Sequence, residues 1–134
     1  MKVLLVSPES ATRDVMRSAV SALERRGYGP LEFIEATDGV RGIELAWQEL
    51  PGIVMADEIS SHAGAFALAR DLRGQDQPFP GIIAILLDRA YDTWLAKWSG
   101  ADAWFVKPVD PFAIADRLSE LVPASTSASK KESA

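Results

Sequence analysis

The chain has 134 residues, of which 48% are hydrophobic and 25% are charged, and its formal net charge is −5. This length is enough for one domain with its own hydrophobic core. Because the chain has no cysteine and a single histidine, the composition excludes disulfides, thiolate zinc sites and multi-histidine metal centres. The acidic balance and the scattered lysines and arginines argue against nucleic-acid binding, which requires clustered positive charge. No apolar run approaches the roughly twenty residues of a membrane-spanning helix, so we expect a cytoplasmic protein that does not associate with a membrane.

Apolar runs of strand length alternate with helical segments along the chain. The apolar runs cover residues 3–6, 31–36, 53–56, 82–87 and 104–106. Several of them are continuous rather than alternating, which is typical of strands buried on both faces of a parallel sheet. Helical spacing, caps and glycine or proline stops predict helices over about 10–26, 40–50, 63–73, 90–99 and 110–122.

This alternation predicts a doubly wound α/β domain over residues 1–123. Residues 124–134 contain no large apolar side chain, so we expect a disordered tail or linker there. In an open parallel sheet, ligands bind beyond the carboxyl ends of the strands. No glycine-rich phosphate fingerprint follows the first strand. The charged side chains expected to face each other at this edge are Asp57 and Lys107.

Three short motifs lie on this strand–helix pattern. They are residues 35–39 (EATDG), residues 51–57 (PGIVMAD) and residues 100–108 (GADAWFVKP). In this order and spacing the chain resembles the receiver domains of bacterial two-component response regulators, and the resemblance covers residues 2–122. The resemblance implies a (βα)5 flavodoxin-like fold with a five-stranded parallel sheet in the order 2-1-3-4-5.

The same resemblance implies roles for three residues. Asp57 would be the phosphoacceptor that takes a phosphoryl group from a kinase histidine, a reaction in which Mg²⁺ neutralises the transferring group. Lys107 would pair with the phosphoryl oxygens. Trp104 stands where the family has its aromatic switch residue.

Two departures from the family pattern fall at the expected site. The family has two adjacent acidic residues that hold Mg²⁺, and this chain has Ser7 and Pro8 instead. The family's switch serine or threonine is replaced by Leu86, or by Leu87 if the register shifts by one residue. Only Asp57 and Glu9 remain as carboxylate ligands for a metal. Glu9 could instead be a solvated residue of the first helical turn, where acidic side chains are favoured. These departures indicate a degenerate pseudo-receiver that works without a cofactor.

Two polar residues beside the expected phosphoacceptor receive no role. His62 lies in the loop after the third strand, and a lone loop histidine is usually solvated. Glu58 directly follows Asp57, so its side chain should point to the opposite face of the sheet.

Aromatic residues gather in the last third of the chain. Trp94, Leu95 and Trp98 fall on one stripe of the fourth predicted helix. We expect Leu95 to pack on the sheet. For Trp94, a core position and a surface position both remain open. We expect Trp98 and Phe112 to be exposed. Together with Trp104 they would form an apolar patch on the face built by the fourth and fifth helices and the fifth strand. Such patches mark protein–protein contacts, and the family uses this face for output and dimerisation.

Three functional hypotheses follow. The first is a signalling module, not an enzyme, that contacts a protein partner or forms a homodimer through this face, with absent or inefficient phosphorylation of Asp57. The second is a phospho-accepting response regulator that binds Mg²⁺ through Glu9 and Asp57 and receives its phosphoryl group from a histidine kinase, within a phosphorelay. The third is a small-molecule-binding domain whose crevice, vacated by the lost acids, is lined by Ser7, Leu86 and Leu87.

Overall fold

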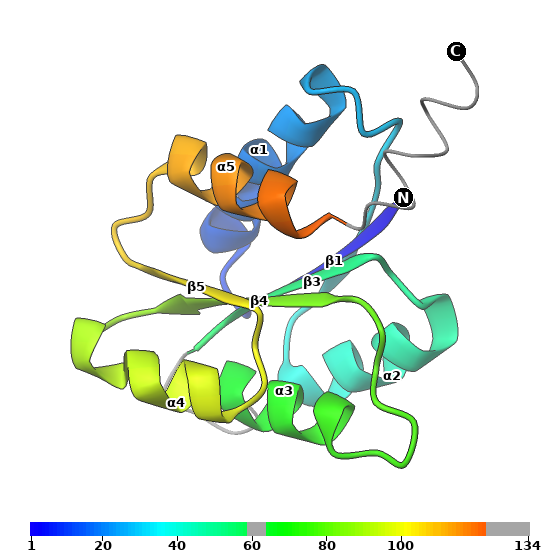
Figure 1. Cartoon of the computed structure of the whole chain (residues 1–134), viewed down its shortest axis with the longest axis vertical. Helices are drawn as coiled ribbons and strands as arrows, with labels where there is room; N and C mark the ends of the chain where they lie inside the picture. The colour runs from blue at the N-terminus through cyan, green and yellow to red at the C-terminus, as the bar shows by residue number, and fades with distance from the viewer. Residues whose placement is uncertain (59–63, 123–134) are drawn as a thin grey trace.

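A computed structural model describes residues 1–58 and 64–122 of the chain (Figure 1). The expected tail at 124–134 and the loop residue His62 lie outside these residues. Within the described part, no helix is long and apolar enough to cross a membrane.

Five parallel strands form one sheet in the order β2-β1-β3-β4-β5. The strands are β1 (Lys2–Val6), β2 (Glu32–Ala36), β3 (Ile53–Asp57), β4 (Ile82–Leu87) and β5 (Ala103–Val106). All residues of β3 and β4 are buried, which explains their continuous apolar runs. The predicted fold class and strand order are confirmed.

Helices cover both faces of the sheet. They are α1 (Ser10–Arg25), α2 (Gly39–Glu49), α3 (Ala65–Arg73), α4 (Thr93–Trp98) and α5 (Pro111–Leu121), with a 3₁₀ turn η1 (Ala90–Asp92) before α4. Helices α1 and α5 pack on one face, and α2, α3 and α4 pack on the other (Figure 1).

The fourth helix is shorter than predicted. The single helix expected over 90–99 is a 3₁₀ turn followed by six residues of α-helix. The side chain of Asp92, at the N-cap, makes no capping hydrogen bond and instead accepts one from Arg89 Nε at 3.1 Å.

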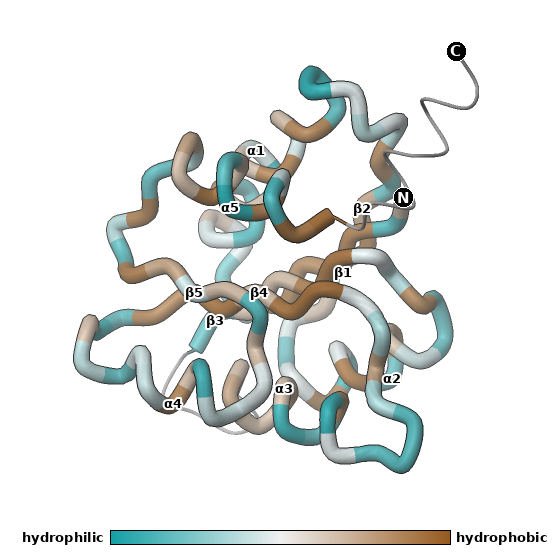
Figure 2. The backbone as a smooth tube through the Cα atoms, in the orientation of Figure 1, coloured by the Kyte–Doolittle hydropathy of each residue, from teal (hydrophilic) through white to brown (hydrophobic). Residues whose placement is uncertain are grey.

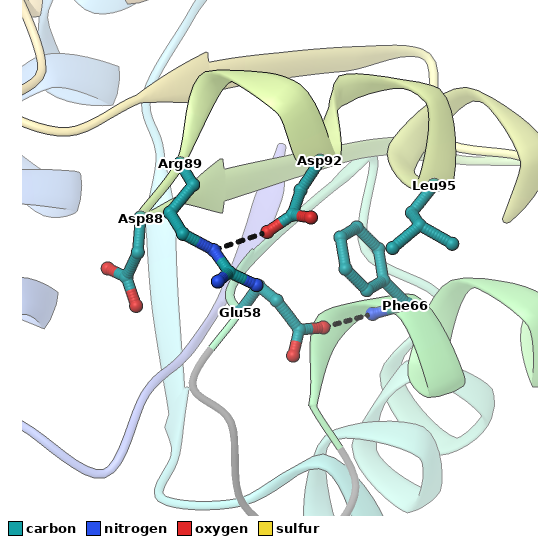
Figure 3. A pocket seen from close by; sticks show the side chains of 6 residues that line it. All are labelled: Glu58, Phe66, Asp88, Arg89, Asp92 and Leu95. Carbon is teal, nitrogen blue, oxygen red and sulfur yellow. Dashed lines mark hydrogen bonds and ion pairs between the residues drawn. The ribbon is translucent and has the colours of Figure 1, made fainter.

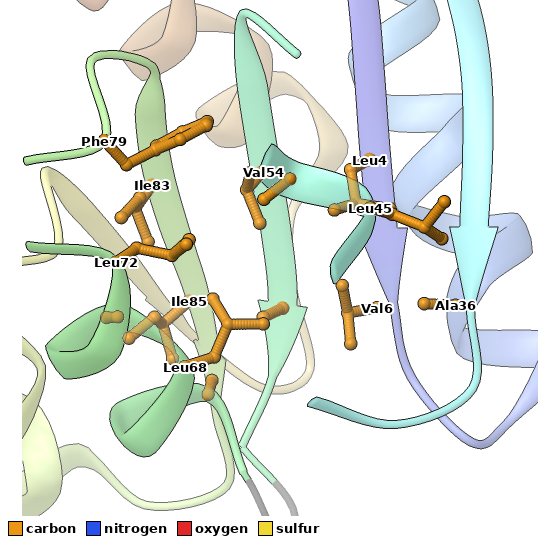
Figure 4. Packing of buried hydrophobic residues seen from close by; sticks show 14 of the residues in the cluster. Leu4, Val6, Ala36, Leu45, Val54, Leu68, Leu72, Phe79, Ile83 and Ile85 are labelled. Carbon is orange, nitrogen blue, oxygen red and sulfur yellow. The ribbon is translucent and has the colours of Figure 1, made fainter. Parts of the chain in front are cut away.

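The hydrophobic core has two layers, one on each face of the sheet. Alternate residues of a strand point to opposite faces, so Leu4 and Val6 belong to the layer under α2, α3 and α4, while Val3 and Leu5 belong to the layer under α1 and α5. Figure 4 shows the first layer, in which side chains of α3 pack on those of β3 and β4. In Figure 2 the central strands are mostly apolar along their length. This sandwiched sheet fixes the edge where the strands end.

An arginine ties α3 to the turns around β4 and β5. Arg73 donates to the carbonyl oxygens of Gly100 and Gly81, each at 3.1 Å, and to that of Phe79, and its Nη2 lies 2.5 Å from Asp102 Oδ2. Gly100 ends α4 with φ +95°, and a Cβ built on it would lie 2.7 Å from Arg73 Cγ. The turn into β5 therefore requires a glycine for two reasons, its backbone angle and its close approach to Arg73.

We predict that Gly100→Ala lowers the free energy of unfolding by about 2–3 kcal/mol, because it combines left-handed strain with the clash against Arg73. Gly29→Ala is the matched control, since Gly29 has φ +81° but no atom within 4 Å of its built Cβ. The control should lose only about 1 kcal/mol. Urea unfolding of both variants measures the difference, and equal losses would contradict the role given to Arg73.

Candidate functional site

A buried carboxylate stands at the centre of the carboxyl edge of the sheet. The Asp57 side chain ends β3 and is 0% exposed. Its Oδ1 lies 2.5 Å from the Lys107 ammonium, and its Oδ2 accepts a hydrogen bond of 3.1 Å from the Ser7 hydroxyl. Within the described residues, Oδ1 takes no other hydrogen bond. The structure thus brings together Asp57 and Lys107 as the sequence predicted, and it adds Ser7 as a direct partner.

Lys107 is shared between two carboxylates. It directly follows β5, where its backbone N–H donates to Leu87 O at 2.8 Å, and its ammonium also lies 3.1 Å from Asp88 Oδ1. Partial burial lowers the pKa of Lys107, but its hydrogen bonds to Asp57 and Asp88 and their negative charges together outweigh burial and raise this pKa above its usual value. One ammonium therefore pairs with two carboxylates, so the group formed by Asp57, Asp88 and Lys107 has a net negative charge.

Ser7 is a fixed structural partner rather than a metal ligand. It is buried, and its hydroxyl accepts the backbone N–H of Glu9 at 3.1 Å while donating to Asp57. Because both hydrogen-bonding directions of the hydroxyl are used, Ser7 holds Oδ2 of Asp57 in place.

The described residues do not fit a magnesium site. Pro8 and Glu9 are exposed, and Glu9 stands at the N-cap of α1 without a side-chain capping bond. Both oxygens of Asp57 already have partners. Across residues 1–58 and 64–122 there is no group of three histidine, cysteine or acidic side chains that could hold a metal ion. A hard divalent cation requires several oxygen ligands, and this donor set does not supply them.

The strand register places Leu86, rather than Leu87, opposite Asp57. Leu86 belongs to the core layer under α1 and α5, whereas Leu87 belongs to the opposite layer. An apolar cavity of about 290 Å³ adjoins Leu86 and is lined by Thr12, Val15, Leu86, Lys107, Pro108 and Val109. Of the three residues expected to line a vacated crevice, only Leu86 lines this cavity.

A second, polar cavity of about 380 Å³ lies on the other side of the β4 end and is lined by Glu58, Phe66, Asp88, Arg89, Asp92 and Leu95 (Figure 3). Glu58 accepts the backbone N–H of Phe66 at 2.9 Å, whereas Asp57 accepts from the Ser7 hydroxyl, so the two adjacent carboxylates have different partners. Burial raises the pKa of Glu58; the Phe66 N–H opposes this, and the nearby charges of Asp57, Asp88 and Asp92 add to it.

The exposed aromatic residues lie on α4 and α5, the two helices that contact the edge strand β5. Trp94, Trp98 and Phe112 are exposed by 63%, 57% and 77%. Trp98 lies under the guanidinium of Arg70 from α3, with 4.2 Å from Cζ to the ring centroid. Phe112 is on α5, which covers the opposite face of the sheet, and Trp104 is half-buried against the core under α2, α3 and α4. The exposed tryptophans therefore belong to the α3–α4 side.

Two partners in the site were not predicted from the sequence. The sequence suggested Ser7 as the replacement of an acid and as a lining residue of a crevice, but not as a hydrogen-bond partner of Asp57, and it suggested no role for Asp88. The available signal for Asp88 was its position as the first residue after β4, on the same edge as Lys107.

Similarity to known proteins agrees with this geometry. The chain is 30% identical over 112 residues to Protein PilH of Pseudomonas aeruginosa, covering 82% of this chain and 88% of PilH. The chain belongs to the receiver family of response regulators. It is 27% identical over 121 residues to the alkaline phosphatase synthesis transcriptional regulatory protein PhoP of Bacillus subtilis, covering 90% of this chain and 48% of PhoP. The chain thus spans about half the length of PhoP.

One similar solved structure is the BeF₃-activated N-terminal receiver domain of Klebsiella pneumoniae RstA. It matches with a TM-score of 0.70 and 26% identity, covering 91% of this chain and 97% of that domain. No family model matches the chain. In this receiver domain, Ser7 and Pro8 follow the carboxyl end of β1, and Ser7 contacts Asp57.

We predict that Lys107→Met lowers the free energy of unfolding by about 2–4 kcal/mol, because it leaves the buried Asp57 carboxylate without a counter-charge. Asp57→Asn should cost less, since an amide still accepts from Ser7 and Lys107 keeps Asp88. In the double variant most of the Lys107→Met loss should disappear. Additive losses in a double-mutant cycle by urea unfolding would contradict the ion pair.

The raised pKa of Glu58 predicts a pH-dependent stability. A carboxyl whose pKa is higher in the folded than in the unfolded protein contributes stability that is present below its usual value of 4.5 and is lost as pH rises through the folded value. The stability of the wild type relative to Glu58→Gln should therefore fall as pH rises above 4.5. Urea unfolding of both proteins across this range measures it, and a constant difference would refute the effect.

Proposed function

We propose that this receiver domain signals through protein–protein contact and that Asp57 is not efficiently phosphorylated. Its place among receiver domains supports a role in signal transduction. One observation carries the rest of the proposal: the Asp57 carboxylate is fully buried, with Lys107 on one oxygen and Ser7 on the other. In this reading the domain transmits its state to a protein partner or to a second copy, and it turns over no substrate.

Phosphoryl transfer depends almost entirely on positioning and on neutralising the charge of the transferring group. An attacking oxygen of Asp57 would have to leave Lys107 or Ser7 and approach phosphorus in line. The phosphoryl donor would meet a site in which two carboxylates share one ammonium. Without acidic ligands at Ser7 and Pro8 to recruit Mg²⁺, this repulsion is uncompensated, which supports slow or absent phosphorylation.

The same ion pair offers an alternative way to set the conformation. By its resemblance to receivers that use phosphorylation, Lys107 would pair with the oxygens of an arriving phosphoryl group. Here the Lys107 ammonium is already held by Asp57 and Asp88. We propose that this arrangement keeps the domain in one state, which a bound partner then recognises.

A phospho-accepting regulator is the second candidate, with Mg²⁺ on Glu9 and Asp57 and a histidine kinase as donor. It is favoured by the similarity to the RstA receiver, whose structure is described as BeF₃-activated. The exposed position of Glu9 at the start of α1 gives it little support. A small-molecule-binding domain is the third candidate, favoured by the apolar cavity beside Leu86.

We predict that restoring the two acids restores ligand binding. Ser7→Asp with Pro8→Asp should lower the thermal stability in the absence of metal, because a carboxylate then faces buried Asp57. Mg²⁺ with beryllofluoride should raise the melting temperature of this variant, by a gain of about 2 kcal/mol at saturating ligand. The wild type should show no such rise.

Adding Asp57→Asn to the restored variant is the control, and it should abolish the beryllofluoride effect. Ser7→Asp alone serves if the double variant is too unstable to purify. A rise in the wild-type melting temperature with Mg²⁺ and beryllofluoride that is lost in Asp57→Asn would overturn the proposal in favour of the second candidate.

A further inference from the structure

The outer face of α4 carries two tryptophans where a surface helix normally has polar residues. Trp94 and Trp98 are one helical turn apart and so share a face. Ala96 lies between them in sequence and is fully buried against the core, so this shared face points away from the sheet. Trp94 and Trp98 are exposed by 63% and 57%, and Tyr91 of the preceding turn by 65%. We call Tyr91, Trp94 and Trp98 the aromatic strip.

The area of the aromatic strip is large for a small domain. A tryptophan or tyrosine side chain presents about 150–250 Å², so three side chains exposed to this degree leave roughly 300–400 Å² of aromatic surface in water. This area is similar to that of the largest apolar patch on a typical monomer, and such a patch is often functional. Trp and Tyr are also the side chains that most often dominate binding energy at interfaces.

Cationic side chains lie beside the strip, although the chain as a whole carries −5 and Asp92 lies next to its Tyr91 end. Arg70 lies over the Trp98 ring at 4.2 Å, and Arg89 lies over the Tyr91 ring at 4.6 Å. Lys97, next to Trp98 in α4, is exposed. Arg89 is paired with Asp92, but neither Arg70 nor Lys97 forms an ion pair with any residue in 1–58 or 64–122. Arg70 and Lys97 are therefore available to an anionic partner.

From this pairing of aromatic area with unpaired cations, we propose that the aromatic strip, with Arg70 and Lys97, binds an acidic segment of a partner protein. Apolar side chains of the segment pack on Trp94 and Trp98, and its carboxylates pair with Arg70 and Lys97. The inference rests on the proposed function, in which the domain acts through protein contact. It places that contact on the α3–α4 side of the molecule, and Phe112 does not take part.

Charge complementarity favours an acidic peptide over a second copy of the chain and over nucleic acid. A two-fold dimer through the strip would bring Arg70 and Lys97 of both copies into one interface, and this concentration of like charge is unfavourable. Nucleic acid binding draws on many phosphate contacts, and two unpaired cations on an acidic protein supply few of them. An acidic peptide with apolar side chains satisfies both the charge and the aromatic area.

The test titrates the whole chain with a short fluorescein-labelled peptide of glutamate and leucine, measured by fluorescence anisotropy. A lysine–leucine peptide of equal length and a thymidine oligonucleotide are the comparison probes. We expect saturable binding of the acidic peptide alone, weakened when NaCl rises from about 0.1 M to about 0.5 M. Trp94→Ala with Trp98→Ala, and separately Arg70→Glu with Lys97→Glu, should each weaken binding at least about tenfold.

Arg25→Glu is a charge-reversal control with half the charge change of the double variant; because Arg25 is exposed at the end of α1, on the other face of the sheet, it should leave binding unchanged. Absence of acidic-peptide binding, equal loss in Arg25→Glu, or stronger binding of either comparison probe overturns the inference. Self-association in sedimentation that Trp94→Ala with Trp98→Ala abolishes also overturns it, in favour of a second copy. The beryllofluoride experiment on the wild type is independent of these probes, so the docking inference and the proposed function can fail separately.

Discussion

The buried ion pair between Asp57 and Lys107 is the interaction on which the rest of the account depends. Its partners stand on β3 and directly after β5, and they meet across β4 because parallel strands end at one edge. A carboxylate with no exposed surface requires a counter-charge, and Lys107 supplies it at 2.5 Å. Whatever this domain does at its carboxyl edge must therefore either keep this pair or replace it.

The substitution of Ser7 for an acid fits this constraint. An additional carboxylate beside Asp57 would compete for a single ammonium that Asp88 already shares. A hydroxyl instead donates to Asp57 and accepts the Glu9 backbone N–H, so both hydrogen-bonding directions of Ser7 are used. The chain has 19 acidic residues, yet positions 7 and 8, beside the buried Asp57, carry none of them.

Much of the fold was predictable because the signals are strong and local. The continuous apolar runs at β3 and β4 correspond to strands buried on both faces, and Asp110 with Pro111 marks the start of α5. The site was predictable where strand ends place charged residues, as for Asp57 and Lys107. Three features required coordinates: the early 3₁₀ turn at η1, the register that selects Leu86, and the contact of Trp98 with Arg70. Each depends on tertiary neighbours, which a helical stripe or a motif does not specify.

The most direct test of the account is the extent of phosphorylation of Asp57 after incubation with acetyl phosphate and Mg²⁺, measured by phosphate-affinity gel electrophoresis. Wild type is compared with Ser7→Asp plus Pro8→Asp on the same gel, with Asp57→Asn as the blank. We expect a phosphorylated species in the restored variant and none above the blank in the wild type. A wild-type band that rises to saturation and is absent from Asp57→Asn would contradict it.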